Sequence, residues 1–178
     1  MENLLRDVLA HFSQLENRLR IFAQQEVQLE GWFKGECLFL LEQLKSRGRI
    51  TDFNREVPTN LGKRKIDITV ELDDKHHWVE LKHWYVGAQK GVVWGPRDYI
   101  DSLENECQKF EAMQTSGRAW VLVFCTPNPG GDLWKEAIRY FNREYVPWKL
   151  VGKTDPADYP RTYFIGLIEC KGLRPESS

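Results

Sequence analysis

Hydrophobic and polar residues alternate between Lys65 and Leu72, a pattern that predicts a β-strand. After Asp73, Asp74 and Lys75, a second run places Val79 and Leu81 on one face and Glu80 and Lys82 on the other. Residues 65–84 therefore predict a β-hairpin with a short loop.

The register of this hairpin decides which side chains share a face of the sheet. A two-residue loop at Asp73 and Asp74 would place Asp67 opposite Glu80, whereas a loop at Asp74 and Lys75 would place Asp67 opposite Lys82. Both registers put Asp67, Glu80 and Lys82 on one face. A three-residue loop would break this alignment, because a slip of one residue turns every side chain to the other face. Two carboxylates and an ammonium group on one face indicate a metal site.

Two amphipathic helices are predicted before the hairpin, over residues 2–25 and 30–47. The apolar stripe of the first helix either packs on the core or pairs with a second copy, which would give a homodimer. The second helix ends before Gly48, a common C-terminal cap. Its Glu36 lies about 60° from Phe33 around the helix, at the edge of the apolar stripe. The Glu36 carboxylate therefore either borders the hairpin or forms a solvated ion pair.

The remaining pattern predicts a strand over 52–60 and no regular element over 85–96. A helix follows over 97–114, and then an entirely apolar strand over 119–125, which is typical of a strand covered on both faces. A further helix over 132–143 and strands at 149–151 and 163–170 complete the chain. This order predicts one α/β domain, 1–178, with a mixed central sheet flanked by helices.

Composition and charge narrow the class of protein. The 178 residues are 42% hydrophobic and 29% charged, as in globular domains. A net charge of −1 excludes a strongly basic protein, so any nucleic-acid surface must be a local patch.

The sequence also bears on the expected compartment. No segment reaches the roughly 18 apolar residues of a membrane span, and the first residues do not resemble a signal peptide. The four cysteines stand in apolar runs without Cys-x-x-Cys spacing, which predicts buried thiols in a reducing environment. We therefore expect a cytoplasmic protein without a membrane partner.

The hairpin side chains suit metal-dependent chemistry on phosphate. Mg²⁺ prefers hard oxygen ligands, and Asp67 and Glu80 supply two carboxylates, with the Leu81 carbonyl as a third oxygen. Glu36 would widen the site if its helix edge faces the hairpin. The Lys82 ammonium group can stabilise charge on a phosphate or help to deprotonate water. The set suits hydrolysis of a phosphodiester with Mg²⁺, for which Mn²⁺ can substitute.

These residues resemble the PD-(D/E)xK nuclease superfamily, which has the restriction-endonuclease-like fold. The resemblance rests on Asp67, twelve intervening residues, Glu80-Leu81-Lys82 and the upstream Glu36. The predicted elements over 30–126 match the family's αβββαβ core. The helix over 1–26 and the extension over 127–178 are then additions.

By this resemblance Asp67, Glu80 and Glu36 are metal ligands and Lys82 is the catalytic lysine. Ile66 stands where many members of the family have a proline. In the helix over 97–114, Gln108 and Lys109 sit where some members place an auxiliary polar residue.

The resemblance implies a Mg²⁺-dependent endonuclease acting on DNA, with RNA as an alternative substrate. The basic turn Lys63, Arg64 and Lys65 predicts phosphate contacts, and Trp84 predicts stacking on a base or sugar. No target-recognition domain is recognisable, so a protein partner would supply specificity.

Three other interpretations remain open at this point. The first is a cross-strand salt bridge on a solvated sheet face. The second is a non-catalytic nucleic-acid-binding or assembly module with the same fold. The third is an adaptor that binds other proteins through its first helix.

Overall fold

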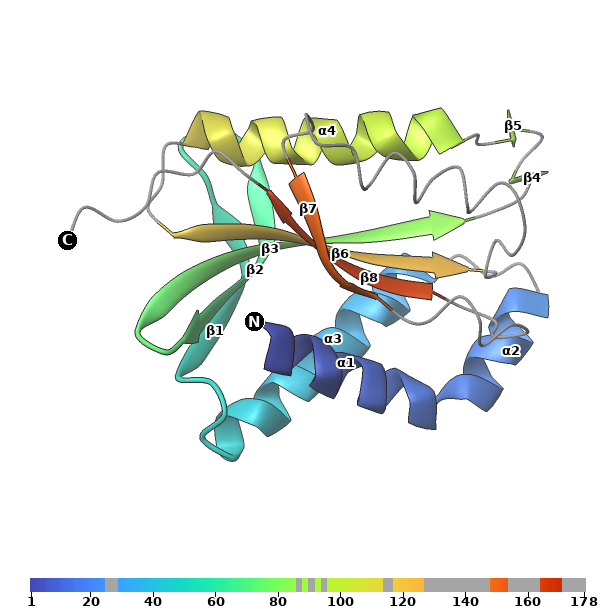
Figure 1. Cartoon of the computed structure of the whole chain (residues 1–178), viewed down its shortest axis with the longest axis horizontal. Coiled ribbons are helices and arrows are strands. Elements are labelled where there is room, and N and C mark those ends of the chain that lie inside the picture. The colour runs from blue at the N-terminus through green and yellow to red at the C-terminus, as the bar shows by residue number, and fades with distance from the viewer. Residues whose placement is uncertain are drawn as a thin grey trace.

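A six-stranded mixed sheet, in the order β1-β2-β3-β6-β8-β7, forms the centre of the molecule in the computed structural model (Figure 1). The structure describes residues 1–24, 29–85, 88–89, 92–93, 96–113, 117–126, 148–153 and 164–170. β3 and β6 pair in parallel, and the other neighbouring strands of this sheet pair antiparallel. The predicted α/β class with a mixed, helix-flanked sheet is therefore confirmed.

The helices lie on both faces of the sheet, with α1 and α3 on one face and α4 on the other (Figure 1). The helices are α1 (Glu2–Gln14), α2 (Glu16–Gln24), α3 (Glu30–Ser46) and α4 (Pro96–Met113). The strands of the main sheet are β1 (Asp52–Pro58), β2 (Lys65–Leu72), β3 (Lys75–Tyr85), β6 (Arg118–Thr126), β7 (Trp148–Lys153) and β8 (Phe164–Cys170). α4 is the crossover that the parallel β3–β6 pair requires.

The single helix predicted over 2–25 is in fact two helices separated at Leu15. The Leu15 N–H donates to the Phe12 carbonyl at 3.0 Å, an i to i+3 bond that tightens the last turn of α1. The apolar stripe of α1 is buried within the chain: the Phe12 ring lies 5.4 Å from that of Phe33 and 5.5 Å from that of Phe124. A homodimer that uses this stripe would first require α1 to detach from the core of its own chain.

The hairpin has the first of the two predicted registers. Leu72 pairs with Lys75 and Ile68 with Val79, so Asp73 and Asp74 form the loop. Their φ angles are 53° and 56°, as in the type I′ turn that suits a two-residue hairpin. This register places Asp67 level with Glu80.

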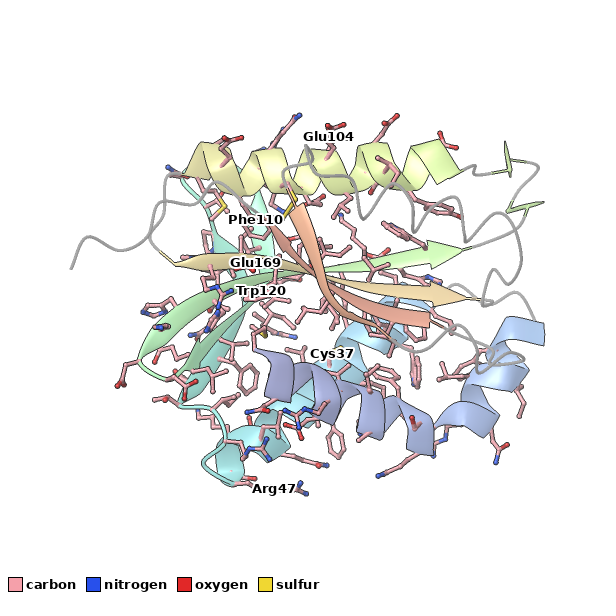
Figure 2. The ribbon with its side chains drawn as sticks, viewed as in Figure 1. Cys37, Arg47, Glu104, Phe110, Trp120 and Glu169 are labelled. Atoms are coloured by element: carbon pink, nitrogen blue, oxygen red, sulfur yellow. A yellow bond between two sulfur atoms is a disulfide. The ribbon has the colours of Figure 1, made fainter. Side chains whose placement is uncertain are left out.

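β6 confirms the prediction of a strand covered on both faces. Trp120 and Phe124 belong to the core on the α3 side, and Val121 and Val123 belong to the core on the α4 side. Figure 2 shows Phe110 on the side of α4 that faces the sheet, and Glu104 on its outer side. Because both faces of β6 are buried, polar alternation is lost there.

The last two strands agree with prediction as β7 and β8, whereas the predicted helix over 132–143 lies outside the described residues. The expectation of no regular element over 85–96 is wrong in part. β4 (Ala88–Gln89) and β5 (Val92–Val93) pair with each other in a separate two-stranded sheet.

The prediction of four reduced thiols is wrong for one pair. A disulfide joins Cys107 of α4 to Cys170 of β8, whose Cα atoms are 5.3 Å apart. Their sequence separation of 63 hides this proximity in the sequence. Cys37 is a buried free thiol, as expected, and the side chain of Cys125 lies outside the described residues. Disulfides persist mainly in oxidising compartments, so this pair does not support the predicted reducing environment.

None of the helices in the described ranges has the length and apolar character needed to cross a membrane.

Candidate metal centre and charged cluster

Asp67 lies where β2 separates from β3. The described ladder between these strands ends at Ile68 and Val79, and the Leu81 N–H donates instead to Asp67 Oδ2 at 2.9 Å. Ile66 and Ile68 are two residues apart but lie in opposite cores, so side-chain alternation breaks at Asp67. The expectation that Asp67 simply shares a face with Glu80 and Lys82 is corrected: its carboxylate fills the gap between the strands.

Glu80 and Lys82 lie on the α4 face of β3. Their neighbours on this face, Trp78 and Trp84, pack in the core beneath α4, while Val79 and Leu81 pack on the α3 side. Glu80 is 7% exposed. A buried carboxylate in an apolar face requires compensating partners, because burial of an unpaired charge is costly.

α4 supplies these partners through Glu106 and Lys109. Lys109 Nζ lies 2.9 Å from Glu80 Oε2 and 3.1 Å from Glu106 Oε2. Lys82 Nζ lies 2.7 Å from Glu106 Oε1 and 3.8 Å from Glu80 Oε1. The four side chains thus form a closed ring of alternating charge.

The sequence pointed to part of this ring. Lys109 was one of two auxiliary candidates, and the other, Gln108, is exposed. Glu106 was missed. Its only sequence signal is its place three residues before Lys109, on the same side of the helix.

α3 contributes Lys34, which the sequence did not single out. Lys34 Nζ lies 2.9 Å from Asp67 Oδ1 and 3.0 Å from Glu30 Oε1. Glu30 and Glu36 each stand three residues from Phe33, at opposite edges of the apolar stripe. The sequence could not tell which edge faces the hairpin.

Glu36 is not part of the cluster. It follows Lys34 by two residues, which is about 200° around the helix. Its Oε2 lies 2.8 Å from His11 Nε2 on α1. The predicted role of Glu36 as a metal ligand beside Asp67 and Glu80 is therefore corrected. The glutamate on the other edge of α3, Glu30, lies near the site instead, because it contacts the same Lys34 that contacts Asp67.

Burial and neighbouring charges shift the pKa values of the cluster. Burial, followed by the Asp67 and Glu106 carboxylates, raises the pKa of Glu80 from 4.5 to about 7 against the opposing effect of Lys109. Burial lowers the pKa of Lys34, but hydrogen bonds to Asp67 and Glu30 outweigh it and raise the value to about 12. The pKa of Lys109 is likewise raised, because its contacts with Glu80 and Glu106 outweigh burial. Lys34 and Lys109 therefore remain charged beside the carboxylates.

The donor set fits Mg²⁺, although no group of three or more His, Cys, Asp or Glu side chains suited to a metal occurs in the described part of the chain. Mg²⁺ needs only one or two carboxylates when waters and substrate phosphate complete its shell. Asp67 and Glu80 are in contact, since the Asp67 N–H lies 3.4 Å from Glu80 Oε2. The N–H and C=O groups of a strand residue point to the same strand edge, so the Leu81 carbonyl is also directed towards β2.

The predicted nucleic-acid contacts divide into two groups. Lys63 and Arg64, between β1 and β2, and Lys65, the first residue of β2, are exposed, and Lys65 Nζ lies 3.0 Å from Glu56 Oε2. Trp84 is 4% exposed and its ring lies 5.0 Å from that of Tyr99 on α4. The prediction that Trp84 stacks on a base or sugar is wrong, because α4 covers it.

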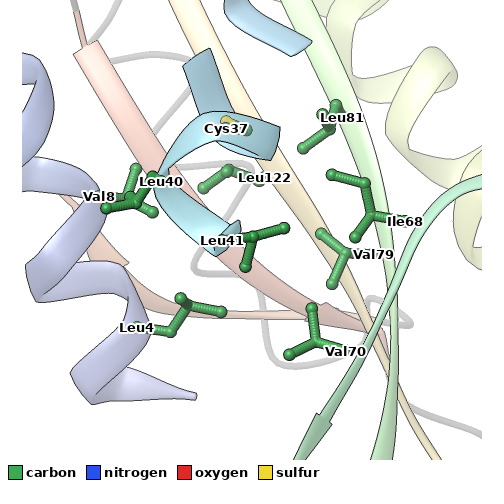
Figure 3. Close-up of a pocket in the computed structure, with 10 residues that line it drawn as sticks. All are labelled: Leu4, Val8, Cys37, Leu40, Leu41, Ile68, Val70, Val79, Leu81 and Leu122. Atoms are coloured by element: carbon green, nitrogen blue, oxygen red, sulfur yellow. The ribbon is translucent and has the colours of Figure 1, made fainter. Parts of the chain in front are cut away.

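A small cavity lies on the α3 side of the sheet, between α1, α3 and the strands (Figure 3). Its volume is about 30 Å³, and side chains such as Leu4, Cys37, Val79 and Leu81 line it. Apolar cavities of this kind stay dry. The cavity is therefore a gap in core packing and not a site for a polar substrate.

Comparisons with known proteins found no matching family profile, no matching curated protein and no matching solved structure.

Proposed function

We propose that this protein is a divalent-metal-dependent nuclease, with its active site at the hairpin and α4. The observation that carries the proposal is the approach of the Glu80 carboxylate to the Asp67 backbone N–H at the point where β2 leaves β3, with Lys82 Nζ 3.8 Å from Glu80 Oε1. Two carboxylates and a backbone carbonyl are oxygen ligands that suit Mg²⁺, and an ammonium group beside them can stabilise charge on a phosphodiester.

The proposal includes the finer fold assignment. The elements α3, β1, β2, β3, α4 and β6 come in the order αβββαβ along the chain, and the short separate pair β4–β5 is inserted between β3 and α4. This order supports a restriction-endonuclease-like core and agrees with the resemblance of Asp67, Glu80 and Lys82 to the PD-(D/E)xK superfamily.

Each side chain has a defined part in the proposed reaction. Bound Mg²⁺ would polarise the phosphate and activate water. Asp67 and Glu80 would hold the metal. Glu80 is buried, so the protein would shield the metal from solvent on the Glu80 side. The Lys82 ammonium group would stabilise negative charge that develops on the phosphate oxygens.

We propose DNA as the substrate, RNA as the alternative, and endonucleolytic cleavage as the reaction. Support comes from the exposed basic turn Lys63, Arg64 and Lys65, which precedes Asp67 at the start of β2. Basic side chains there would contact the phosphate backbone without reading sequence. A protein partner that supplies specificity remains part of the proposal.

A second candidate is a non-catalytic nucleic-acid-binding module. The pairing of Asp67 with Lys34, and of Glu80 with Lys109, favours it. These pairs would leave the carboxylates as structural ion-pair partners. The two candidates differ in whether a divalent cation displaces the ammonium groups.

Cleavage assays with matched variants test the proposal. Supercoiled plasmid, linear duplex, single-stranded DNA and RNA would each be incubated with Mg²⁺ or Mn²⁺. We expect wild type to cleave at least one of them, and Lys82→Ala or Asp67→Asn to reduce the rate by about 10²-fold or more. Lys45→Ala is the control, because Lys45 pairs with Asp52 on the surface of the molecule.

Thermal unfolding of each variant would separate lost chemistry from lost folding. Equal metal-dependent cleavage by wild type and Lys82→Ala would refute the assignment. Binding of nucleic acid without turnover in either metal would favour the second candidate.

A further inference from the structure

Two lysines from different helices each neutralise one carboxylate of the proposed metal site. Lys34 of α3 contacts Asp67 at 2.9 Å, and Lys109 of α4 contacts Glu80 at 2.9 Å. Each lysine is also held by a glutamate of its own helix, Glu30 or Glu106. The same arrangement thus occurs on both sides of the sheet.

The lysines occupy the positions where a cation would neutralise the strand carboxylates. Lys34 takes Asp67 Oδ1, whereas Asp67 Oδ2 accepts the Leu81 N–H. Lys109 takes Glu80 Oε2. An ammonium group on a carboxylate oxygen repels a divalent cation that approaches the same carboxylate, so the lysines and the metal compete for Asp67 and Glu80.

The net charge of the cluster changes sign when a divalent cation binds. The cluster holds three ammonium groups (Lys34, Lys82 and Lys109) and four carboxylates (Glu30, Asp67, Glu80 and Glu106), a formal charge of −1. A divalent cation changes this charge to +1. One phosphodiester, with its single negative charge, restores neutrality. Binding of metal therefore makes the cluster attract an anion such as a phosphodiester.

Lys34 and Lys109, once displaced from the carboxylates, are suited to bind that phosphate. The lysine side chain is a flexible stem with a compact charge at its end, so its ammonium group can move several ångströms while its backbone stays in place. Lys34 and Lys109 approach the two neighbouring carboxylates from opposite faces of the sheet. Both would then be available to contact a phosphate held at the metal.

We propose that Lys34 and Lys109 are substrate-binding residues that neutralise Asp67 and Glu80 until a divalent cation binds, and then contact a phosphate of the nucleic acid. This inference rests on the proposed nuclease function. It extends that function by assigning two phosphate-binding side chains and an order of binding, metal before phosphate.

Affinity for Mn²⁺ provides the first test, by isothermal titration without nucleic acid. Lys34→Met and Lys109→Met remove a competitor from the site, so each should bind Mn²⁺ about fivefold to tenfold more tightly than wild type. Lys45→Met is the control on α3, about 16 Å along the helix from Lys34, and should bind as wild type does. Unchanged or weaker Mn²⁺ binding by both lysine variants would overturn the proposal.

Salt dependence of nucleic-acid binding provides the second test. Binding of a duplex oligonucleotide would be measured by fluorescence anisotropy with Mn²⁺, in a Lys82→Ala background that prevents turnover. Each Lys→Met change should weaken binding and reduce the slope of log K against log salt by about 0.9, the value for one lost phosphate contact. An unchanged slope would overturn the assignment to phosphate, even if Mn²⁺ binds more tightly.

Charge-preserving variants guard against a folding defect. Lys34→Arg and Lys109→Arg keep a cation at each position and should retain the wild-type salt slope. If both the Arg and the Met variants lose the slope, the assignment to phosphate contact through charge is overturned.

The tests also separate this inference from the function on which it rests. If the Asp67→Asn variant binds Mn²⁺ as tightly as wild type does, the proposed metal site itself fails. If it does weaken binding but the lysine variants do not tighten it, the inference alone fails.

Discussion

Glu80 shows how the site works at the scale of a single residue. Its carboxylate lies in an apolar face of β3, beside two other carboxylates, and its pKa of about 7 is set first by burial and then by Asp67 and Glu106. The same environment that disfavours a negative charge favours a cation beside it. A divalent metal would therefore offset the unfavourable free energy of holding the Glu80 carboxylate buried beside other negative charges.

The raised pKa predicts a pH-dependent stability for the metal-free protein. Between about pH 4.5, the ordinary value, and pH 7, folded Glu80 binds more protons than unfolded Glu80. Stability from this group therefore falls as pH rises through that window, by up to about 3 kcal/mol. Glu80→Gln removes the titration, so its melting temperature should rise relative to wild type as pH increases from 4.5 to 7.

Melting curves in the absence of metal would measure this difference. Glu111→Gln, at an exposed position of the same helix that covers Glu80, is the control. A difference between Glu80→Gln and wild type that stays constant with pH would contradict a raised pKa for Glu80.

At the scale of elements, the turns that set strand register position the site. The type I′ loop at Asp73 and Asp74 puts Asp67 level with Glu80. Gly117, just before β6, has φ 116°, and a Cβ there would lie 2.8 Å from the His76 carbonyl oxygen of β3. This close approach lets β6 begin its parallel pairing beside His77.

Substitution of two glycines separates backbone strain from steric conflict. Gly48 also has a positive φ, 68°, but a Cβ there meets nothing within 4 Å. Gly48→Ala should cost about 1 kcal/mol from the left-handed backbone alone. Gly117→Ala should cost about 3 kcal/mol, because the His76 backbone must also move. Urea unfolding midpoints would measure both, and equal losses would contradict the steric contribution.

At the scale of the whole molecule, the disulfide fixes α4 against the far half of the sheet. Cys107 stands between Glu106 and Lys109 on α4, and its partner Cys170 ends β8. The bond therefore anchors the turn of α4 that supplies two charged side chains to the site.

Loss of this disulfide should lower global stability. It closes a loop with a sequence separation of 63 residues, so Cys107→Ser with Cys170→Ser should lower the melting temperature by about 5–15 °C. Dithiothreitol should lower the melting temperature of wild type to a similar extent and leave that of the double variant unchanged. A wild-type melting curve that does not respond to dithiothreitol would show that the bond does not form in solution.

The sequence by itself determined the features that depend on local period and turn chemistry. Alternation of hydrophobic and polar residues predicted β2 and β3, and the apolar run 119–125 predicted a central strand. The short loop left two hairpin registers open, and the structure has the one with Asp73 and Asp74 in the loop. These predictions hold because neighbouring residues along the chain decide them. Asp67 and Glu80 came from the same local pattern.

Only the tertiary structure decided which helix edges face the hairpin. Glu36 and Glu30 are equivalent by helical angle, yet Glu36 pairs with His11 of α1 while Glu30 and Lys34 approach Asp67. Trp84 is covered by α4, and Cys107 meets Cys170, through contacts between segments distant in sequence. Helix rotation and layer packing depend on the fit of whole surfaces, which no local period records.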